Sequence, residues 1–239
     1  MRPNFITRLK GLIFPNVCLY CNKIIHQNSS FCLDCWPKLQ FITDPKCKIC
    51  SYPLEFEGIQ TICAKCIESK PQFDQNISIF RYNYVIKKVI SKLKYQDQQY
   101  LSKKLAKLLS QNSKLDFKNF DIITCIPSHN KQLQKRKYNH SALLAKSLCK
   151  ISANQNFNPN LLIKIKHTKA QAQLTRKQRL KNLNSAFKVN PKFLGNIKHK
   201  SILIIDDVTT THATLNEISK TLRKLKPSKI STLTIAKTF

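Results

Sequence analysis

Short runs of branched apolar residues alternate with helical periodicities along the greater part of this chain. The runs predict buried strands at 77–82, 121–126, 161–165, 201–205 and 229–235. Apolar positions three and four residues apart predict helices at 84–95, 98–111, 139–150 and from the loop after the fourth strand to about residue 225. Strands that alternate with helices indicate the α/β class, with a mostly parallel sheet flanked by helices on both faces.

The first 70 residues follow a different pattern, in which cysteine pairs replace the apolar runs. The chain opens with a basic, amphipathic stretch, MRPNFITRLKGLIFPN, which predicts a helix packed on the protein. The cysteine spacing stops at Lys70-Pro71, where we place a domain boundary. Residues 1–70 are expected to form an N-terminal helix and a small cysteine-rich module, and residues 71–239 are expected to form the α/β domain.

Four CxxC pairs, separated by ten, eleven and twelve residues, lie in the module. Each pair places two thiolates on one tight turn, and two turns can surround Zn²⁺ with four sulfurs, which leaves no open coordination position. The spacing therefore predicts two structural zinc sites. We assign one zinc to the first two pairs and one to the last two, while an interleaved pairing stays open. The ligands are Cys18, Cys21, Cys32 and Cys35 for one site, and Cys47, Cys50, Cys63 and Cys66 for the other.

Disulfides are the rival interpretation of these cysteines, and they require an oxidising compartment. The chain has no apolar run long enough for a secretory signal or a membrane span. We therefore expect a cytoplasmic protein that has no transmembrane segment and keeps its thiols reduced.

The stretch SILIIDDVTTTHATLNE, at 201–217, concentrates the candidate chemistry. An apolar strand leads into two acids, Asp206 and Asp207, then into a threonine-rich turn and a helix. The first N–H groups of a helix lack internal acceptors and favour an anion such as phosphate. Threonine hydroxyls add donors, and the carboxylates can accept hydrogen bonds from sugar hydroxyls. Helix capping alone would need one such residue, whereas six occur within nine positions.

The formal net charge of the chain is +30, from 42 basic and 12 acidic residues. Such a charge favours polyanionic partners, although an AT-rich genome would also produce a lysine-rich chain. Seventeen Lys or Arg and no acidic residue occur between Asp121 and Asp206. One long section can therefore line a positive surface beside the proposed anion site, unless it is merely a solvated face.

The stretch at 201–217 resembles the corresponding segment of phosphoribosyltransferases, which carry an apolar strand, two acids and a T-T-G-A-T loop. That resemblance implies that the acids hold the ribose of phosphoribosyl pyrophosphate and that the loop holds its 5-phosphate. The matching positions are Asp206, Asp207, Thr210, Thr211, Ala213 and Thr214, and His212 stands in place of the glycine. A β-carbon and an imidazole restrict the close approach and positive φ that glycine allows, so phosphate binding is expected to be weakened or reshaped.

Other segments extend the resemblance to the ComF family, which joins a double zinc ribbon to a phosphoribosyltransferase-like domain. KRKYNHSALLAK at 135–146 and AQAQLTRKQRLKNLNSAF at 170–187 resemble two segments of that family. The resemblance implies a cytosolic role in uptake of transforming DNA, with single-stranded DNA as a partner, and binding of phosphoribosyl pyrophosphate with Mg²⁺. Contacts to pyrophosphate or to a DNA backbone are expected from Ser128, Lys135, Arg136, Lys137, Arg176 and Arg179.

Three functions compete on this basis. The first is a single-stranded-DNA-binding accessory protein that carries a sugar-phosphate site. The second is an active phosphoribosyltransferase acting on a base or amine, for which no catalytic residue is assigned. The third is a scaffold that docks a DNA translocase or other competence proteins through its zinc ribbons. Net charge and His212 favour the first function.

Overall fold

The computed structural model describes residues 16–25, 29–55, 58, 61–95, 100–128, 138–166 and 183–239. The predicted N-terminal helix lies outside these residues. Within them, no helix is long and apolar enough to cross a membrane.

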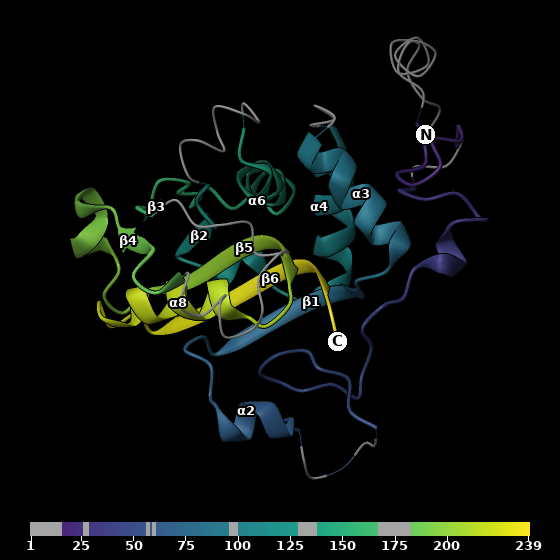
Figure 1. Ribbon diagram of the computed structural model, residues 1–239. Coiled ribbons are helices and arrows are strands. Elements are labelled where there is room, and N and C mark those ends of the chain that lie inside the picture. Colours follow the sequence, from purple (N-terminus) through teal and green to yellow (C-terminus); the bar gives the residue numbers. More distant parts are fainter. Residues whose placement is uncertain are drawn as a thin grey trace.

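Four parallel strands form the central sheet, in the order β1-β6-β5-β2 (Figure 1). Their bounds are Gln75–Arg81 for β1, Ile122–Cys125 for β2, Ser201–Thr209 for β5 and Lys229–Lys237 for β6. The sheet confirms the predicted α/β class. Strand β5 is longer than the predicted 201–205, because it continues through the two acids and pairs with β6 as far as Thr209.

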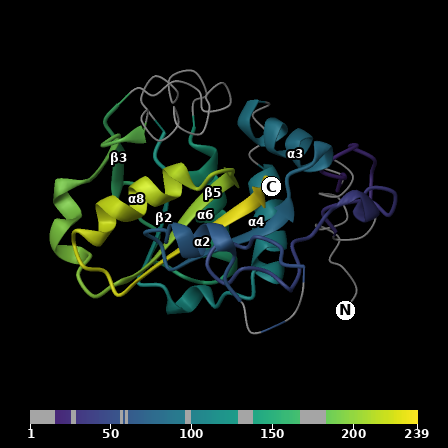
Figure 2. The same cartoon turned by 60° about the horizontal axis from the view of Figure 1, so that its bottom comes forward.

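Helices cover both faces of this sheet (Figures 1 and 2). One face carries α3 (Tyr84–Tyr95), α4 (Tyr100–Asn112) and α6 (His140–Ile151), and the other carries α8 (Ala213–Arg223). Alternate residues of β5 point to opposite faces of the sheet. Leu203 and Ile205 belong to the hydrophobic cluster beneath α3, α4 and α6, and Ile202 and Ile204 belong to the cluster beneath α8. This two-sided burial explains why the strand is an unbroken apolar run.

The predicted strand at 161–165 does not join the central sheet. It forms β3 (Leu162–Lys164), which pairs antiparallel with β4 (Phe187–Val189). The outer edge of β2, which faces away from β5, already has a partner. Ile123 forms a bridge with Phe157 and exchanges backbone hydrogen bonds with Asn156 and Asn158. The chain then turns away before β3 begins, so the third strand of the predicted series pairs elsewhere.

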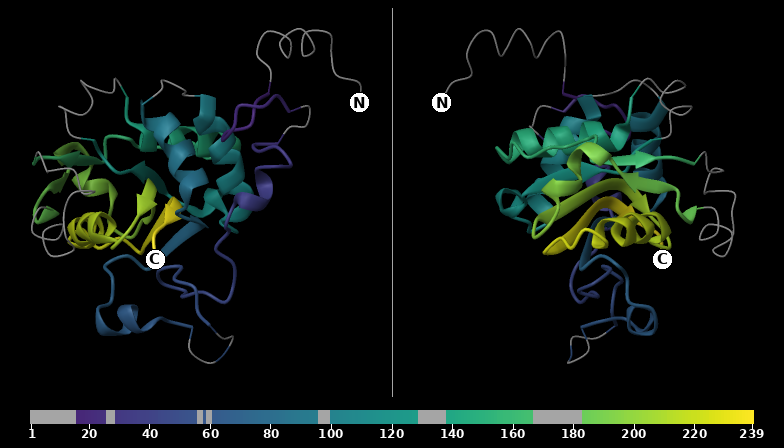
Figure 3. Two further views of the ribbon diagram at one scale, coloured as in Figure 1. Left: turned by 45° about the vertical axis from the view of Figure 1, so that its right-hand side comes forward. Right: turned by 90° about the vertical axis from the view of Figure 1, so that its left-hand side faces the viewer.

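Short helical segments complete the described chain. They are η1 (Trp36–Lys38), α2 (Ala64–Glu68), η2 (Phe117–Asn119) and η4 (Pro191–Asn196). The two cysteine-rich segments do not stack on each other: the first lies beside α3 and α4, and the second lies against the sheet near β1 (Figure 3). The N-terminal region is therefore two ribbons that pack on the α/β domain at separate places.

Candidate functional site

The cysteine sulfurs gather into two groups of four, and within each group the sulfur atoms lie within 4.8 Å of one another. The first two CxxC pairs form one group and the last two form the other, as assigned from the spacing. The Cys21 and Cys32 sulfurs are 3.7 Å apart, and those of Cys50 and Cys63 are 3.6 Å apart. A zinc–sulfur distance of about 2.3 Å gives a tetrahedron with edges of about 3.8 Å, so both donor sets fit a structural zinc ion.

Each cysteine group combines two kinds of turn. The Cys18 and Cys47 carbonyls accept the N–H groups of Asn22 and Ser51, which both have positive φ, at 65° and 57°. The second pair of each group instead begins a helical turn, η1 or α2. A left-handed residue closes the first turn tightly, so that both sulfurs point to one centre.

The two acids of the candidate anion site lie near the carboxyl end of β5. Strand β2 is its neighbour, and Cys125 of β2 stands opposite Ile205. The segment that follows β2, including Ser128, therefore leaves the sheet at the same edge as Asp206 and Asp207. The carboxyl ends of parallel strands are the usual place for ligand sites in open α/β sheets.

Asp207 is buried, and two side chains from outside the predicted site, a lysine and a histidine, lie against its carboxylate. The Lys94 ammonium forms an ion pair with one oxygen, and His140 Nε2 lies 3.7 Å from the other. Burial would raise the pKa of Asp207, but Lys94 and then His140 hold that pKa well below its ordinary value. Asp207 is therefore an ionised carboxylate that is already neutralised from within the protein.

Asp206 has the opposite character. Burial raises its pKa well above the ordinary value, and the neighbouring charge of Asp207 raises it further. Ser141, near the start of α6, donates its hydroxyl to Asp206 Oδ1 at 3.3 Å. The adjacent acids thus form a pair of unequal acidity, in which one carboxyl keeps its proton more readily than the other.

The loop between β5 and α8 leaves the N-terminus of α8 without a side-chain cap. His212 is the N-cap residue, its side chain makes no capping hydrogen bond, and the first turn of α8 carries no acidic residue. Thr211 Oγ1 is buried and has no hydrogen-bond partner within the described chain. Asp206, Thr210, Ala213 and others enclose a cavity of about 20 Å³, which holds about one water molecule. A helix N-terminus without a side-chain cap and the spare hydroxyl of Thr211 suit an anion at this place.

His212 has a left-handed backbone conformation, with φ 57° and ψ 8°. A residue with a β-carbon adopts this conformation at a cost of about 1–2 kcal/mol relative to glycine. The imidazole lies against Phe73, with ring centroids 5.5 Å apart. Burial, and then the charge of Lys237, lower the pKa of His212 to about 3, so the ring is neutral near pH 7.

Of the residues expected to contact pyrophosphate or DNA, only Ser128 is described. It lines a cavity of about 460 Å³ with Asn139 and Lys164, at the edge of the sheet where Asp206 lies. Lys135, Arg136, Lys137, Arg176 and Arg179 lie outside the described residues.

The sequence reasoning did not assign Lys94, His140 or Ser141 to the site. His140 and Ser141 lie in the 135–146 segment that resembles the ComF family, which was the available signal. No sequence motif pointed to Lys94, because its ion pair joins residues 113 positions apart and depends on how α3 packs on the sheet.

Comparisons with known proteins agree with this architecture. The double zinc ribbon domain matches residues 9–68. Competence protein F of Haemophilus influenzae is 28% identical over 226 residues, which cover 92% of this chain and 96% of that protein. Competence protein ComFC of Bacillus subtilis is 24% identical over 245 residues, with 94% and 96% covered. DNA utilization protein YhgH of Escherichia coli (strain K12) is 23% identical over 181 residues, with 74% and 77% covered.

A solved structure of the allosteric regulatory enzyme of purine biosynthesis aligns with 60% of this chain and 29% of its own, with a TM-score of 0.40 and 15% identity. The sequence similarity to the competence proteins extends over nearly their whole length, and the double zinc ribbon occupies the N-terminal part, as expected. These similarities support the resemblance to the ComF family that the sequence motifs indicate.

Proposed function

We propose that this protein is a ComF-type accessory protein that binds single-stranded DNA during uptake of transforming DNA and carries a site for phosphoribosyl pyrophosphate. The observation that carries the proposal is the arrangement at the end of β5, in a chain of net charge +30. There Asp206 lines a small cavity with the uncapped start of α8, and Asp207 pairs with Lys94. Relatives named for competence and DNA utilization support the DNA-handling part.

The site offers separate groups for the two parts of such a ligand. The N–H groups at the start of α8 and the Thr211 hydroxyl would receive the 5-phosphate. Asp207 would accept hydrogen bonds from the ribose hydroxyls, because its carboxylate is ionised. The basic residues around the site, including Lys164 in the neighbouring cavity, would favour the pyrophosphate electrostatically.

The acid pair does not fit direct coordination of Mg²⁺. The ion prefers oxygen ligands, whereas the Lys94 ammonium already occupies one oxygen of Asp207 and the pKa of Asp206 is raised. Mg²⁺ commonly binds through substrate phosphates with few protein ligands. We therefore assign Mg²⁺ to the pyrophosphate oxygens of the ligand and not to the two aspartates.

Calorimetric titration of the zinc-loaded protein with phosphoribosyl pyrophosphate and Mg²⁺ tests the site. We expect binding by the native chain and none by an Asp206→Asn, Asp207→Asn double variant. A double variant of two exposed acids, Asp34→Asn and Asp44→Asn, is the control and should bind like the native chain. If the native chain fails to bind and His212→Gly restores binding, the protein has kept the fold and lost the ligand.

Single-stranded DNA binding is tested separately, by the fluorescence anisotropy of a labelled oligonucleotide over a salt series. Affinity should fall steeply with salt, because a protein that neutralises phosphates releases counterions. An affinity that hardly changes between low and high salt would contradict a basic DNA-binding surface.

The left-handed backbone at His212 also favours a second candidate function, phosphoribosyl transfer to a base or amine, because positive φ is the conformation that glycine at this position of the T-T-G-A-T loop would adopt freely. Pyrophosphate release in a screen of nitrogen nucleophiles would support it. If the protein binds phosphoribosyl pyrophosphate but releases no pyrophosphate with any nucleophile of a broad screen, the result would count against transfer.

A further inference from the structure

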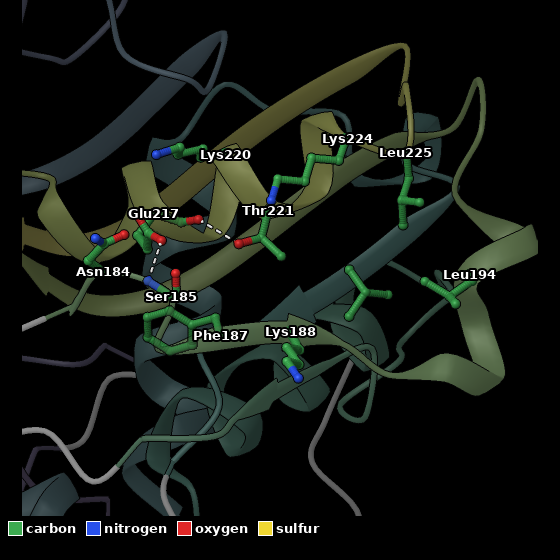
Figure 4. Close-up of a pocket in the computed structure, with 11 residues that line it drawn as sticks. Asn184, Ser185, Phe187, Lys188, Leu194, Glu217, Lys220, Thr221, Lys224 and Leu225 are labelled. Carbon is green, nitrogen blue, oxygen red and sulfur yellow. Dashed lines mark hydrogen bonds between the residues drawn. The ribbon is translucent and has the colours of Figure 1, made fainter.

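A groove on the α8 face of the sheet lies apart from the acid pair and is not part of any site described above. It has a volume of about 380 Å³ and lies between α8 and the segment that contains β4 and η4. Figure 4 shows Glu217 and Thr221 of α8 and its C-cap residue Lys224 on one side, and Phe187, Lys188 and Leu194 on the other. A cavity of this size can hold one planar group of a small ligand.

The floor of the groove is apolar and its rim is basic. Leu194 is a large apolar side chain that is 46% exposed, and Phe187, Val189 and Leu225 also line the groove. Its basic side chains are Lys188, Lys220 and Lys224, all exposed. The one acid is Glu217, whose carboxylate accepts the Ser185 N–H at 2.9 Å. The rim therefore keeps an excess of positive charge.

The spacing of the lysines suits a polymer of anions. Lys220 and Lys224 are four residues apart and so lie next to each other along α8 and its C-terminal turn. Lys188 of β4 supplies a third ammonium group on the other side of the groove. A chain that follows this rim can place successive anionic groups near successive ammonium groups.

We propose that this groove, defined by Phe187, Lys188, Leu194, Lys220 and Lys224, binds single-stranded DNA, with a base over Leu194 and phosphates at the lysines. The inference rests on the proposed DNA-binding function and assigns a place to it. Single-stranded nucleic acid combines regular anions with flat apolar faces, which matches a basic rim around an apolar floor. A duplex keeps its bases stacked inside, so single strands are the preferred form.

The test measures the anisotropy of a labelled oligo-thymidine with the zinc-loaded full chain, as a function of salt. In the Lys220→Gln, Lys224→Gln variant we expect affinity about tenfold lower and a log–log salt slope shallower by about 1.4, because two phosphate contacts are lost. Leu194→Ala should weaken binding about fivefold and leave the salt slope unchanged, because it removes a base contact only.

The matched control is Lys146→Gln, Lys150→Gln. These lysines are also exposed and four residues apart, but they lie on α6, on the opposite face of the sheet. The control removes the same net charge and should bind within about twofold of the native chain. Zinc content and melting temperature show that each variant is folded, and Lys188→Gln serves as a second groove variant.

The outcomes separate the inference from the proposed function. If the native chain binds the oligonucleotide and both lysine pairs have equal effects, DNA binds elsewhere and only the groove assignment is wrong. If the native chain does not bind at all, the proposed DNA-binding function fails and the groove assignment fails with it. If an acidic peptide displaces the oligonucleotide and binds more tightly than it does, the groove is a protein-docking site and the assignment to DNA is overturned.

Discussion

The two zinc ribbons have the same ligands and similar turns, yet they are attached to the α/β domain in different ways. Hydrogen bonds from lysines of two helices hold the first ribbon, which lies beside α3 and α4. Buried hydrogen bonds with residues of two strands, β1 and β6, hold the second, which lies against the sheet. All four cysteines of the second group are buried, whereas Cys21 of the first group is exposed.

The first ribbon is attached chiefly through lysine side chains. Lys92 of α3 is 4% exposed and donates to the carbonyl oxygens of Leu19 and Tyr20, at 2.9 Å each, and to Asn22 Oδ1 at 2.7 Å. Lys104 of α4 donates to the Val17 carbonyl at 2.6 Å. These bonds fix α3, and α3 also carries Lys94, the cation that pairs with Asp207.

The second ribbon supports the other side of the candidate site. Lys237 of β6 donates to the Cys50 carbonyl at 2.6 Å, and Ser51 Oγ donates to the Asn76 carbonyl at 2.7 Å. The segment Gln72–Asp74, which links this ribbon to β1, lies on α8. Gln72 N–H donates to Asn216 Oδ1, and Arg223 donates to the Gln72 carbonyl and to Asp74.

The two ribbons therefore contact different elements around the candidate site that contains Asp206 and Asp207. The first fixes α3 and its lysine, and the second fixes α8 and the loop that precedes it. We therefore expect loss of either zinc to weaken ligand binding at the proposed site, although neither zinc would contact the ligand.

The two ribbons should differ most in how the loss of each zinc site affects the folding of the α/β domain. Cys47→Ser, Cys50→Ser should abolish cooperative unfolding of the whole domain, because a structural zinc contributes about 10–16 kcal/mol in small zinc domains and this site is integrated with the sheet. Cys18→Ser, Cys21→Ser should lose one zinc and leave the sheet domain folded. Zinc content and calorimetric melting measure both effects. Equal loss of melting temperature in the two variants would remove the distinction between the ribbons.

Replacement of Lys94 should have the next largest effect, because it leaves the buried Asp207 carboxylate without its ammonium partner. We expect Lys94→Met to lower the free energy of unfolding by about 3 kcal/mol, measured in urea. The Lys94→Met, Asp207→Asn double variant should recover part of that loss. The control is Lys87→Met, an exposed residue of α3, which should be close to neutral. A neutral Lys94→Met would mean that the ion pair does not organise the site.

The lysine contacts of the two ribbons should differ in a third measurement. Lys92→Met leaves three acceptors without their donor and should cost about 2 kcal/mol. Lys237→Met should cost about 1 kcal/mol, because Asn76 Nδ2 also reaches the Cys50 carbonyl, at 3.4 Å. Lys229→Met, at the exposed start of β6, is the control. Chemical denaturation measures the free energy of unfolding of each variant. A larger loss in Lys237→Met than in Lys92→Met would contradict the proposed difference between the two attachments.

The sequence predicted what depends on local spacing. The CxxC intervals predicted both cysteine groups, and apolar runs predicted the four strands of the central sheet. Contacts between distant segments were not predictable: the antiparallel pairing of β3, the occupied edge of β2 and the ion pair of Lys94 with Asp207 all depend on tertiary packing. The packing of His212 on Phe73 was not predictable either, because Phe73 is 139 residues away.

The smallest predicted effect concerns the contact between the second ribbon's linker and the loop. His212 packs on Phe73, and burial lowers its pKa to about 3, from an ordinary value of about 6.5. Between these values the unfolded chain binds a proton that the folded chain does not, so this group lowers stability as pH falls below about 6.5. Because the residue is partly exposed, we expect a loss of less than about 1 kcal/mol at pH 5.

His212→Asn should remove this part of the pH dependence, because asparagine tolerates positive φ and does not titrate. His199→Asn is the matched control: His199 also has a left-handed backbone, with φ 61°, but its side chain is exposed. The measurement is the free energy of unfolding in urea at pH 7 and pH 5. If both variants show the native pH dependence, burial does not hold His212 neutral in the folded chain, and its packing on Phe73 does not contribute to the pH dependence of stability.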